Sequence, residues 1–515
     1  MIISPTGNKS WTNRHETFTQ AIENLYNLAN NNSGDVLADY NDTTQSIQKI
    51  IQEAIDSNRQ LRVLGGEWSW TKIAASTGIL LNTKPLNLSF QISKSNVSTG
   101  YTKSPGDLYF AQCGNSVKEL SDLLRTMNRS LKTSGASNGQ TIVGAMSTGT
   151  HGSAIDVGSI PDYVVGLHII VNPKRHVWLE RKSYSVVSDS FVKNINAELV
   201  QDDGLFNAAL VSFGCFGFIH GVMIETVPLF LYQCYRLRVP MDNNLFSLME
   251  TLDFATTKVK LPFGNERPYH FQTLINQYDT TNLANVTVMY KRPYKPGYKP
   301  PSMPAKIGPG DDAPTFIAGI AGAVPKLVPT LVNKLIGTSY APYDNLWGTH
   351  AEIFTNTDTH GKVLSSALGV PLDRVNQVRQ LMVDINKTSG PFAGVFAFRF
   401  VKGTQATIGF TRFSQTCIIE LDSVLSDESY KFYDSVWNEL FKQKIPFTFH
   451  WGKILNLDPS KVRTMYTDQK VNDWLIARKT LMQDERSMRV FTNEAMHQWG
   501  LDSVSMNIGA TNIVA

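Results

Sequence analysis

The most informative stretch of the sequence is residues 134–152, which read SGASNGQTIVGAMSTGTHG. Five of these nineteen residues are glycine, six are serine or threonine, and none is Asp, Glu, Lys or Arg. This composition disfavours both a helix and an ordinary strand. It suits a backbone that approaches a large ligand closely and offers it N–H and hydroxyl groups, which can hold an anion without lysine. Four apolar residues argue against an exposed glycine loop: Ile142, Val143, Ala145 and Met146.

A second glycine turn lies upstream, directly after a short apolar run. Leu61–Leu64 (LRVL) predicts a strand, and the next residues read Gly65-Gly66-Glu67-Trp68-Ser69-Trp70. A strand that leads into a Gly-Gly turn commonly brings backbone N–H groups to a phosphate. Alone this turn is a weak signal, and it gains weight from the glycine-rich stretch that follows.

Together the two turns resemble the FAD-binding domain of the vanillyl-alcohol oxidase (PCMH-type) flavoproteins. In that family a G-x-G-H-S-like turn and a later T-G-T-H-G-like turn enclose the cofactor. Thr148–Gly152 matches the second turn in full, whereas the first turn has Glu67 and Trp68 in place of glycine and histidine. The glycine-spaced segment 213–222 is also similar to the end of the family's flavin domain. The resemblance therefore covers about residues 36–230.

The resemblance implies which residues bind the FAD. They are Gly65, Gly66, Glu67, Trp68, Ser69, Trp70, Ser134, Gly135, Thr141, Gly144, Ser147, Thr148, Gly149, Thr150, His151, Gly152, Gly221, Val222 and His450. In many members a histidine in the first turn is bonded to the flavin. Because Trp68 occupies that position and an indole is not expected to form the bond, we expect noncovalent FAD with Trp68 packed on it.

The whole-chain composition excludes several classes of protein. The 515 residues carry a net charge of +4 with no basic stripe, so nucleic acid is not an expected partner. The four cysteines are scattered, and no HExxH or Cys-x-x-Cys pattern predicts a metal site. The N-terminus lacks the basic start and apolar core of a signal peptide, which predicts a cytoplasmic protein.

The periodicity predicts intermixed helices and strands up to residue 230, and hence an α/β layer. A helix is expected around residues 47–54 and another over 117–127. Strands are expected at 61–64, 79–81, 108–112 and 163–171.

Near residue 231 the composition changes to longer polar and proline-rich stretches. This change predicts a second domain, a substrate or cap domain over 231–465. Residues 393–422 predict three consecutive strands of an antiparallel cap sheet, and 427–441 predict a helix with Ser426 as its N-cap. The final segment, 466–515, is expected to return to the FAD domain of residues 1–230. The expected fold is thus a two-domain α/β (α+β) flavoprotein.

Two unusual segments interrupt the cap domain. Residues 290–314 form a proline-rich loop or linker. Residues 315–337 are apolar but too short and proline-interrupted to span a bilayer. Two short helices packed on the cap are the favoured interpretation, and a lid over a lipophilic substrate or a membrane-surface contact is the alternative.

A late motif points to catalysis. FAD needs donors for its phosphates and a cation or dipole near the ring edge that becomes anionic on reduction. Residues 447–453 read FTFHWGK, and Phe491–Asn493 reads FTN. Both resemble the C-terminal part of sugar-lactone and alditol oxidases. The resemblance implies that His450 lies against the flavin and that Lys453 reaches into the substrate space.

The family's cap strand often carries a Glu-x-Arg pair on one face. Here the matching residues are Ala397-Phe398-Arg399, so the arginine is present and the glutamate is absent. Glu420, on a later strand, could supply the carboxylate across the sheet, or it could be a surface residue. We expect Lys453, Arg399, Glu420 and His450 to form the catalytic group.

The sequence therefore predicts an FAD-dependent enzyme that oxidises a CH–OH group by hydride transfer to flavin N5. An alditol, a sugar lactone or a related alcohol is the expected substrate, and a more lipophilic or natural-product alcohol is the alternative. O2 is one candidate electron acceptor. A flavin-binding protein without catalysis stays open, and Gly135–Gly139 (GASNG) formally fits the G-x-S-x-G elbow of a serine hydrolase with Ser137 as nucleophile.

Overall fold

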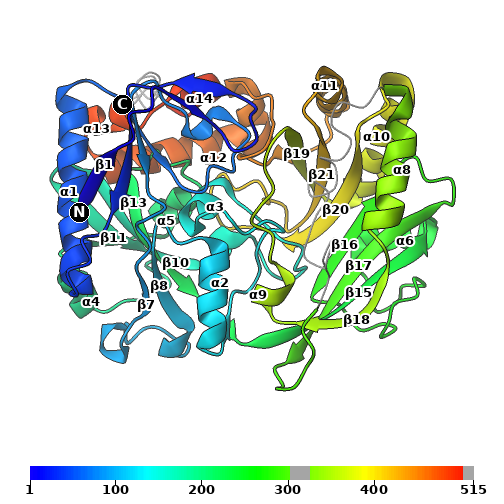
Figure 1. Cartoon of the computed structure of the whole chain (residues 1–515), viewed down its shortest axis with the longest axis horizontal. Helices are drawn as coiled ribbons and strands as arrows, with labels where there is room; N and C mark the ends of the chain where they lie inside the picture. Colours follow the sequence, from blue (N-terminus) through cyan, green and yellow to red (C-terminus); the bar gives the residue numbers. More distant parts are fainter. Residues whose placement is uncertain (302–324, 503–515) are drawn as a thin grey trace, which may run out of the picture.

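The computed structural model describes residues 1–301 and 325–502, which form two halves lying side by side (Figure 1). One half contains the N-terminal part of the chain (blue to cyan) together with the C-terminal helices (orange to red). The other half is built from the middle of the chain (green to yellow). Part of the proline-rich segment and residues 315–324 of the apolar segment lie outside the described residues.

Two sheets form the first half. A four-stranded sheet has the order β1 (Ile2–Pro5), β4 (Asn24–Ala29), β6 (Ile79–Asn82) and β5 (Leu61–Leu64). A six-stranded sheet has the order β12 (Glu198–Gln201), β11 (Arg175–Glu180), β10 (Val164–Asn172), β13 (Phe218–Glu225), β8 (Leu108–Gln112) and β7 (Ser89–Gln91). Strands β4, β6 and β5 are parallel, and in the second sheet only β11 and β12 are parallel.

Short strands and helices complete this half. The strands are β2 (Ser10–Thr12), β3 (Thr19–Ala21), β9 (Arg129–Ser130) and β14 (Val227–Pro228). The helices are α1 (Val36–Asp56), α2 (Val117–Thr126), α3 (Ile142–Thr148), α4 (Asp189–Asn194) and α5 (Asp203–Leu210). The mixture of helices and strands confirms the predicted α/β class, and the strands predicted at 61–64 and 108–112 have the same bounds in the structure.

The glycine-rich stretch contains a helix, which corrects the expectation that its composition excludes one. Helix α3 covers seven residues and begins after Thr141, whose side chain accepts a hydrogen bond from the Gly144 N–H. It ends at Gly149, whose φ of 78° is a left-handed conformation that favours glycine. Burial of Ile142, Ala145 and Met146 in the main core outweighs the poor helix propensity.

One antiparallel sheet of eight strands forms the second half. Its order is β18 (Tyr343–Gly348), β15 (Phe230–Pro240), β17 (Leu283–Pro293), β16 (His270–Ile275), β20 (Gly394–Lys402), β21 (Gln415–Val424), β19 (Val363–Pro371) and β22 (Thr448–Phe449). The helices of this half are α6 (Asn243–Thr251), α8 (Val328–Ser339), α9 (His350–Ile353), α10 (Val375–Ser389) and α11 (Asp427–Lys442). The antiparallel cap sheet is confirmed.

Residues 393–422 supply two strands of this sheet, not the three that were predicted. Strands β20 and β21 pair over their whole length, and a loop of residues 403–414 joins them. The predicted third strand lies in this loop, where the Thr404 N–H donates to the Thr411 carbonyl and closes a turn. Helix α11 is as predicted, and the Ser426 hydroxyl caps it by accepting from the Ser429 N–H at 3.2 Å.

Helix α8 is the described part of the apolar segment. Val328, Val332 and Ile336 are buried and pack with Leu274 and Val395 of the cap sheet. This agrees with a helix packed on the cap, and the lid alternative falls partly on residues outside the described ranges. In the parts of the chain that the structure describes, no helix is long and apolar enough to cross a membrane.

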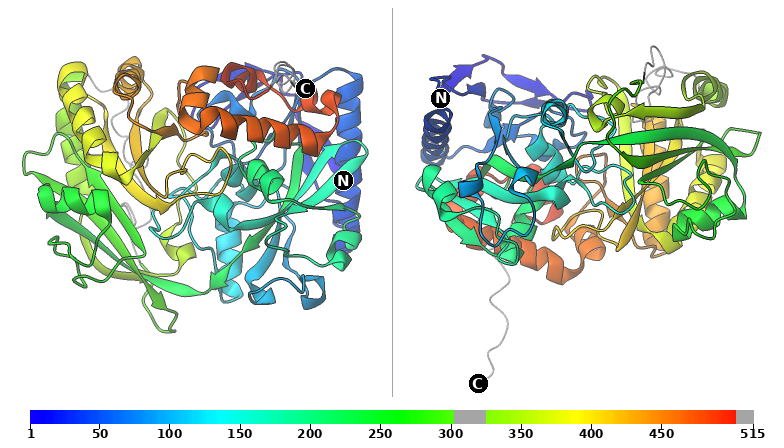
Figure 2. Two further views of the ribbon diagram at one scale, coloured as in Figure 1. Left: turned by 180° about the vertical axis from the view of Figure 1, so that it is seen from behind. Right: turned by 90° about the horizontal axis from the view of Figure 1, so that it is seen from below.

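The C-terminal helices return to the first half (Figure 2). They are α12 (Pro459–Met482), α13 (Glu485–Val490) and α14 (Glu494–Trp499), and α12 packs on α5 while α13 packs on α1. The Trp474 indole donates to the Val211 carbonyl at 3.0 Å, and the buried Arg478 donates to the Cys215 carbonyl at 2.8 Å. The domain limits at 230 and 465 stay predictions, although β15 begins at Phe230.

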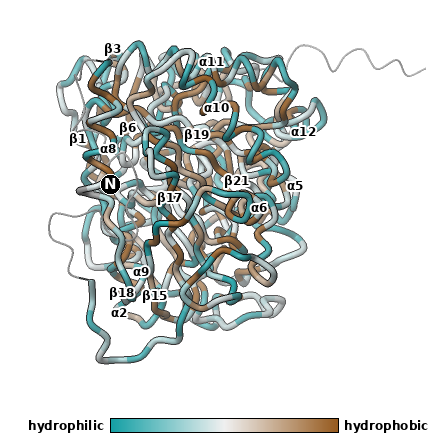
Figure 3. Tube along the Cα trace, turned by 90° about the vertical axis from the view of Figure 1, so that its right-hand side faces the viewer, coloured by the Kyte–Doolittle hydropathy of each residue, from teal (hydrophilic) through white to brown (hydrophobic). Residues whose placement is uncertain are grey.

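Hydrophobic segments concentrate inside the molecule and polar segments toward its rim (Figure 3). The main core joins both halves, because Phe213 of the first half packs against Trp451, which follows β22, at 4.6 Å between ring centroids. All four cysteines are buried.

Candidate functional site

A deep cleft runs between the two halves. The first half lines it with the turn after β5, the glycine-rich stretch and residues around Phe213–Ile219. The second half contributes Arg399 of β20, Glu420 of β21 and the turn that holds His450 and Lys453. The empty space is about 1460 Å³ including the open mouth.

The two glycine turns meet at this cleft with almost no space between them. A Cβ atom on Gly65 would come within 2.2 Å of the Thr141 hydroxyl oxygen, and one on Gly66 within 2.6 Å of the Gly139 carbonyl oxygen. Both positions therefore require glycine. Within the described chain, the backbone N–H groups of residues 66–69 donate to no protein acceptor. This row of free donors lining the cleft suits a diphosphate.

Glu67 shows why the family's glycine can be replaced here. Its φ of 63° is left-handed, a conformation for which the family's glycine is the natural residue. The Glu67 carboxylate accepts a hydrogen bond from the Trp11 indole at 2.6 Å, which holds the side chain in place. The Glu67 carbonyl also accepts from the Arg14 N–H.

The N-terminal segment covers the first turn, a feature that sequence reasoning missed. The Asn13 amide donates to the Ser69 carbonyl and the Thr17 hydroxyl to the Trp70 carbonyl, both at 2.9 Å. The Arg14 guanidinium lies 4.5 Å from the ring centroid of Trp68. No motif in residues 11–17 signals this role, because it depends on tertiary contacts alone.

Most of the predicted cofactor residues line the cleft. They are Gly65, Gly66, Glu67, Trp68, Ser69, Trp70, Gly135, Thr141, Gly144, Ser147, Thr148, Thr150, His151 and His450. Five others do not: Ser134, Gly149, Gly152, Gly221 and Val222.

These five residues have structural roles instead. Ser134 shares a 2.8 Å hydrogen bond with the buried His350, and Gly149 ends α3. A Cβ on Gly152 would lie 2.5 Å from the Ser134 carbonyl oxygen, and one on Gly221 only 2.4 Å from the Phe110 ring. Val222 is fully buried in the core.

Several lining residues were not predicted. They include Trp11, Arg62, Cys113, Gln140, Phe213, Gly214, Gly217 and Thr359. Gly217 could have been predicted, because it belongs to the segment 213–222 that was noted for its glycine spacing. In the structure its φ is 111°, a conformation that favours glycine. The buried Gln140 side-chain oxygen has no hydrogen-bond donor in the described structure, which leaves it available to a ligand.

At the other end of the cleft, one carboxylate holds two cations. The Lys453 ammonium lies 2.7 Å from Glu420 Oε1, and Arg399 Nε lies 2.9 Å from Glu420 Oε2. Glu420 and Arg399 are 2% and 3% exposed, and Lys453 is 12% exposed. The cluster therefore carries a net positive charge in a nearly dry site.

The sheet register shows which residue supplies the carboxylate that is absent from position 397. Ala397, at the place of the family's glutamate, is paired directly with Glu420 on the neighbouring strand. Paired residues in an antiparallel sheet project to the same face. Glu420 therefore lies beside Arg399 across the sheet and is not a surface residue.

The carboxyl group of Glu420 is held in its ionised form. Burial acts to raise its pKa, but Arg399 and then Lys453 more than offset this, so the pKa lies well below its usual value. Glu420 therefore stays negatively charged, holds Arg399 and Lys453 in position, and is a poor proton acceptor.

Two neutral histidines complete the site. Burial lowers the pKa of His151 to about 4, and burial also holds the pKa of His450 well below its usual value. His450 Nδ1 accepts from the Gly452 N–H at 3.0 Å, which leaves its proton on Nε2. His151 Nδ1 donates to the Gly152 carbonyl at 3.0 Å, so its unprotonated Nε2 faces Glu420 Oε1 at 3.7 Å.

Lys453 lies on the turn that follows β22. Its N–H donates to the His450 carbonyl at 3.1 Å, which closes the turn. The Gly452 carbonyl accepts from the Trp70 N–H at 2.8 Å. The His-Trp-Gly-Lys turn is thereby fixed to the first glycine turn of the other half.

The serine-hydrolase elbow is not formed. Ser137 pairs with Asn356 in an isolated bridge, and the next helix begins only at Ile142. A nucleophile elbow joins a strand directly to a helix. The hydrolase hypothesis therefore has no geometric support.

Comparison with known proteins identifies the first part of the chain. Residues 40–175 match the model of a family described as FAD binding domain. This region is an FAD binding domain. The resemblance to PCMH-type flavoproteins, inferred from Thr148–Gly152, is confirmed, and FAD is the cofactor.

Two relatives are sugar-lactone enzymes by name. A putative D-arabinono-1,4-lactone oxidase of Neurospora crassa is 28% identical over 41% of this chain and 32% of the relative. An L-gulono-1,4-lactone dehydrogenase of Mycobacterium tuberculosis is 21% identical over 78% of this chain and 83% of the relative. The match thus spans about a third of the Neurospora protein.

The fold extends beyond the FAD domain to the whole molecule. A crystal structure of cholesterol oxidase from B. sterolicum superposes with a TM-score of 0.69 and 16% identity. The match covers 96% of this chain and 97% of that one. Both the FAD domain and the cap therefore have the architecture of this flavoprotein fold.

Proposed function

We propose that the protein is an FAD-dependent oxidoreductase that removes two electrons from a CH–OH group of a sugar lactone, an alditol or a related polar alcohol. The observation that carries the proposal is the buried Arg399–Glu420–Lys453 cluster in the same cleft as the two glycine turns. The bound FAD supplies a hydride acceptor.

We propose that the cofactor is held noncovalently. The free N–H groups of residues 66–69 would receive the diphosphate, and α3 lies beside them. Trp68 is fixed tightly, since a Cβ on Gly139 would lie 2.6 Å from its ring. Its indole takes the place of the family's flavin-linking histidine and would pack on the cofactor.

The chain's own residues prepare the alcohol for oxidation. Arg399 and Lys453 would stabilise negative charge that develops on the reacting groups in the cleft, because a cation in a dry site strongly stabilises developing negative charge. Glu420 keeps both cations in position. The Nε2–H of His450 is a further donor inside the cleft.

The substrate class is supported by the named relatives and by the charge of the site. Several relatives are lactone oxidases or dehydrogenases by name, and a cluster of charged hydrogen-bonding groups suits a polar, hydroxyl-rich molecule. The same experiment measures whether O2 reoxidises the reduced flavin.

The test is a substrate panel followed by flavin absorbance under argon. Sugar lactones, alditols and lipophilic alcohols are mixed separately with the FAD-loaded protein. Bleaching by one of the first two classes is the expected result. Bleaching by lipophilic alcohols alone would replace the substrate class, and no bleaching by any CH–OH compound would contradict the activity. Admitting air to the bleached sample then measures reoxidation by O2.

A further inference from the structure

A second polar pocket lies outside the cleft, where four segments meet. Arg181 follows β11, Asn207 belongs to α5, Thr404 and Arg412 belong to the loop between β20 and β21, and Tyr466 and Lys470 belong to α12. Helix α12 crosses the face of the molecule seen in the left view of Figure 2 (orange). The empty space is about 900 Å³ including the open mouth.

The cations of this pocket have no carboxylate partner. Within the described ranges, no carboxylate oxygen lies within 4.0 Å of the charged groups of Arg181, Arg412 or Lys470. Arg181 Nε donates to the Asn207 side-chain oxygen at 2.9 Å, and the Arg412 guanidinium lies over the Phe413 ring at 4.7 Å. Burial lowers the pKa of both arginines, and for Arg181 the charges of Asp162 and Asp203 offset this only in part.

Two acids lie at the pocket, and both are already engaged. Asp162 accepts from the Thr404 hydroxyl at 2.6 Å and from the Gln405 N–H at 3.3 Å. Asp203 accepts from the Ser183 N–H at 2.9 Å and also from the Ser183 hydroxyl. Three cations and two carboxylates thus leave a net charge of about +1 around the pocket.

A buried hydroxyl adds an independent sign of a ligand. Tyr466 lines the pocket, is 2% exposed, and its hydroxyl has no hydrogen-bond partner in the structure described. A buried, unpaired hydroxyl is costly unless a ligand or water satisfies it.

The backbone next to Tyr466 is strained. Thr467 has φ 68° and ψ 153°, a conformation that is essentially limited to glycine, and it interrupts α12. The Lys470 N–H donates to the Thr467 hydroxyl at 3.4 Å, so Thr467 caps the second part of the helix, residues 468–482. The start of this fifteen-residue helical part therefore lies beside the pocket and adds its positive end.

We propose that this pocket binds a phosphate group, either free phosphate or the phosphate of a small metabolite. Arginine side chains and a helix N-terminus are the groups that recognise phosphate oxygens. The site is distinct from the cleft, because the loop of residues 403–414 separates them. On its other side this loop packs Phe410 against His450 and His151, at 4.8 and 5.3 Å between ring centroids.

The test is isothermal titration calorimetry on the FAD-loaded protein at constant ionic strength. Inorganic phosphate, pyrophosphate and glucose 6-phosphate are the probes, and acetate controls for general anion effects. Saturable binding of at least one phosphate compound but not of acetate is expected. Tighter binding of glucose 6-phosphate than of inorganic phosphate would indicate an organic phosphate, and equal binding would indicate free phosphate.

Substitutions locate the binding. Arg412→Gln and Arg181→Gln should each weaken phosphate binding by about tenfold or more, as expected for loss of a charge-assisted hydrogen bond. Tyr466→Phe removes one hydroxyl and should weaken phosphate binding by a few-fold. Arg374→Gln, at an exposed arginine elsewhere on the cap, is the matched control and should bind as the unmodified protein does. The flavin spectrum reports that each variant is folded. Absence of saturable binding, or unchanged binding in both arginine variants, would overturn the proposal.

Discussion

At the scale of single residues, the site depends on a few side chains whose environment sets their chemistry. Glu420 is ionised because two cations hold it, and His450 is neutral because it is buried. Sequence motifs identified Arg399, His450 and Lys453 by residue type, yet their charge states follow from burial and partners. Those could not be predicted before the fold was known.

Ser137 tests whether the serine of the GASNG sequence has any chemical role. Ser137→Ala should leave the oxidation rate within a few-fold, because the side chain contributes at most a hydrogen bond worth about 1 kcal/mol. The measurement is steady-state turnover of the substrate found with the panel. A loss approaching the roughly millionfold effect of removing a nucleophile would revive the hydrolase hypothesis.

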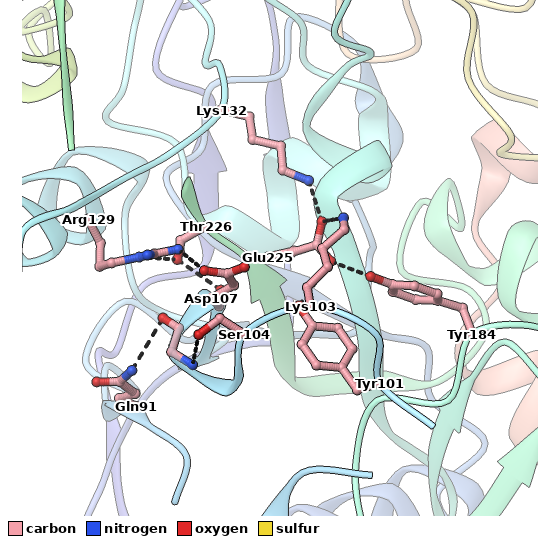
Figure 4. A network of polar contacts seen from close by, with 11 residues as sticks. Gln91, Tyr101, Lys103, Ser104, Asp107, Arg129, Lys132, Tyr184, Glu225 and Thr226 are labelled. Carbon is pink, nitrogen blue, oxygen red and sulfur yellow. Dashed lines mark hydrogen bonds and ion pairs between the residues drawn. The ribbon is translucent and has the colours of Figure 1, made fainter. Parts of the chain in front are cut away.

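Glu225 of β13 is the centre of a second ion network, shown in Figure 4. Its carboxylate lies 2.5 Å from the Lys103 ammonium and 2.6 Å from the Lys132 ammonium, and it accepts from the Tyr184 hydroxyl at 2.6 Å. Burial acts to raise the pKa of Glu225, but the hydrogen bonds from Lys103, Lys132 and Tyr184 lower it to about 2. Its folded pKa is thus below its ordinary value of 4.5.

A carboxyl group with a depressed pKa stabilises the fold above its unfolded pKa and loses that effect as the pH falls through its folded pKa. We expect Glu225→Gln to lower the free energy of unfolding at pH 7 by about 2 kcal/mol, a value reduced because Lys103 is half exposed. The difference from the unmodified protein should shrink between about pH 4.5 and pH 2. Chemical denaturation across that range is the measurement, with the exposed Glu53→Gln as control. A difference that stays constant with pH would contradict this assignment.

At the scale of elements, the site is assembled by register and by contacts between halves. Strand β21 places Glu420 directly opposite Ala397 on β20. The turn after β22 is fixed to the first glycine turn by the hydrogen bond that the Trp70 N–H donates to the Gly452 carbonyl. The sequence offered Glu420 only as one of two interpretations. The pairing of Ala397 with Glu420, 23 positions later in the chain, is not visible in a local pattern.

The register makes a reciprocal exchange possible. Glu420→Ala should slow flavin reduction by about 10²-fold or more, since it removes the carboxylate that both buried cations contact. The double variant Ala397→Glu/Glu420→Ala moves the carboxylate to the opposite, paired position and recreates the family's Glu-x-Arg sequence. We expect it to recover about tenfold or more of the loss, because paired Cβ atoms lie only about 5 Å apart.

Anaerobic stopped-flow reduction of the three proteins measures this recovery. Glu420→Gln, which keeps the size of the side chain and removes its charge, is the control. A double variant that binds FAD but reduces it no faster than Glu420→Ala would show that the carboxylate must come from β21.

At the scale of the whole molecule, the fold was largely predictable and the boundaries of the site were not. The two glycine turns and the antiparallel cap could be inferred because glycine positions and strand patterns are local signals. The position of residues 11–17 over the first glycine turn could not be predicted, and neither could helix α3. Both depend on contacts with distant segments. The cytoplasmic location and the domain limits stay predictions.

The whole FAD-loaded protein should be yellow and should release its flavin into solution on acid precipitation. This follows from Trp68, whose indole replaces the family's flavin-linking histidine. The measurement is the flavin absorbance of the supernatant and the pellet. Flavin that stays with the precipitated protein would contradict noncovalent binding, and His450 would then be the first attachment site to test.

The most direct test of the central claim is the rate of flavin reduction in Lys453→Met. This change removes the ammonium next to Glu420 and keeps most of the side-chain volume, so folding and FAD content should survive. Lys453→Arg should restore the rate only in part, because a planar guanidinium cannot occupy the place of a compact ammonium. Lys442→Met, at an exposed lysine of α11, is the matched control.

With the substrate found by the panel, anaerobic stopped-flow should show flavin reduction slowed by about 10²-fold or more in Lys453→Met. The control should reduce its flavin at the unmodified rate. An unchanged rate in Lys453→Met with a full complement of FAD would contradict the proposed oxidation at the Arg399–Glu420–Lys453 cluster.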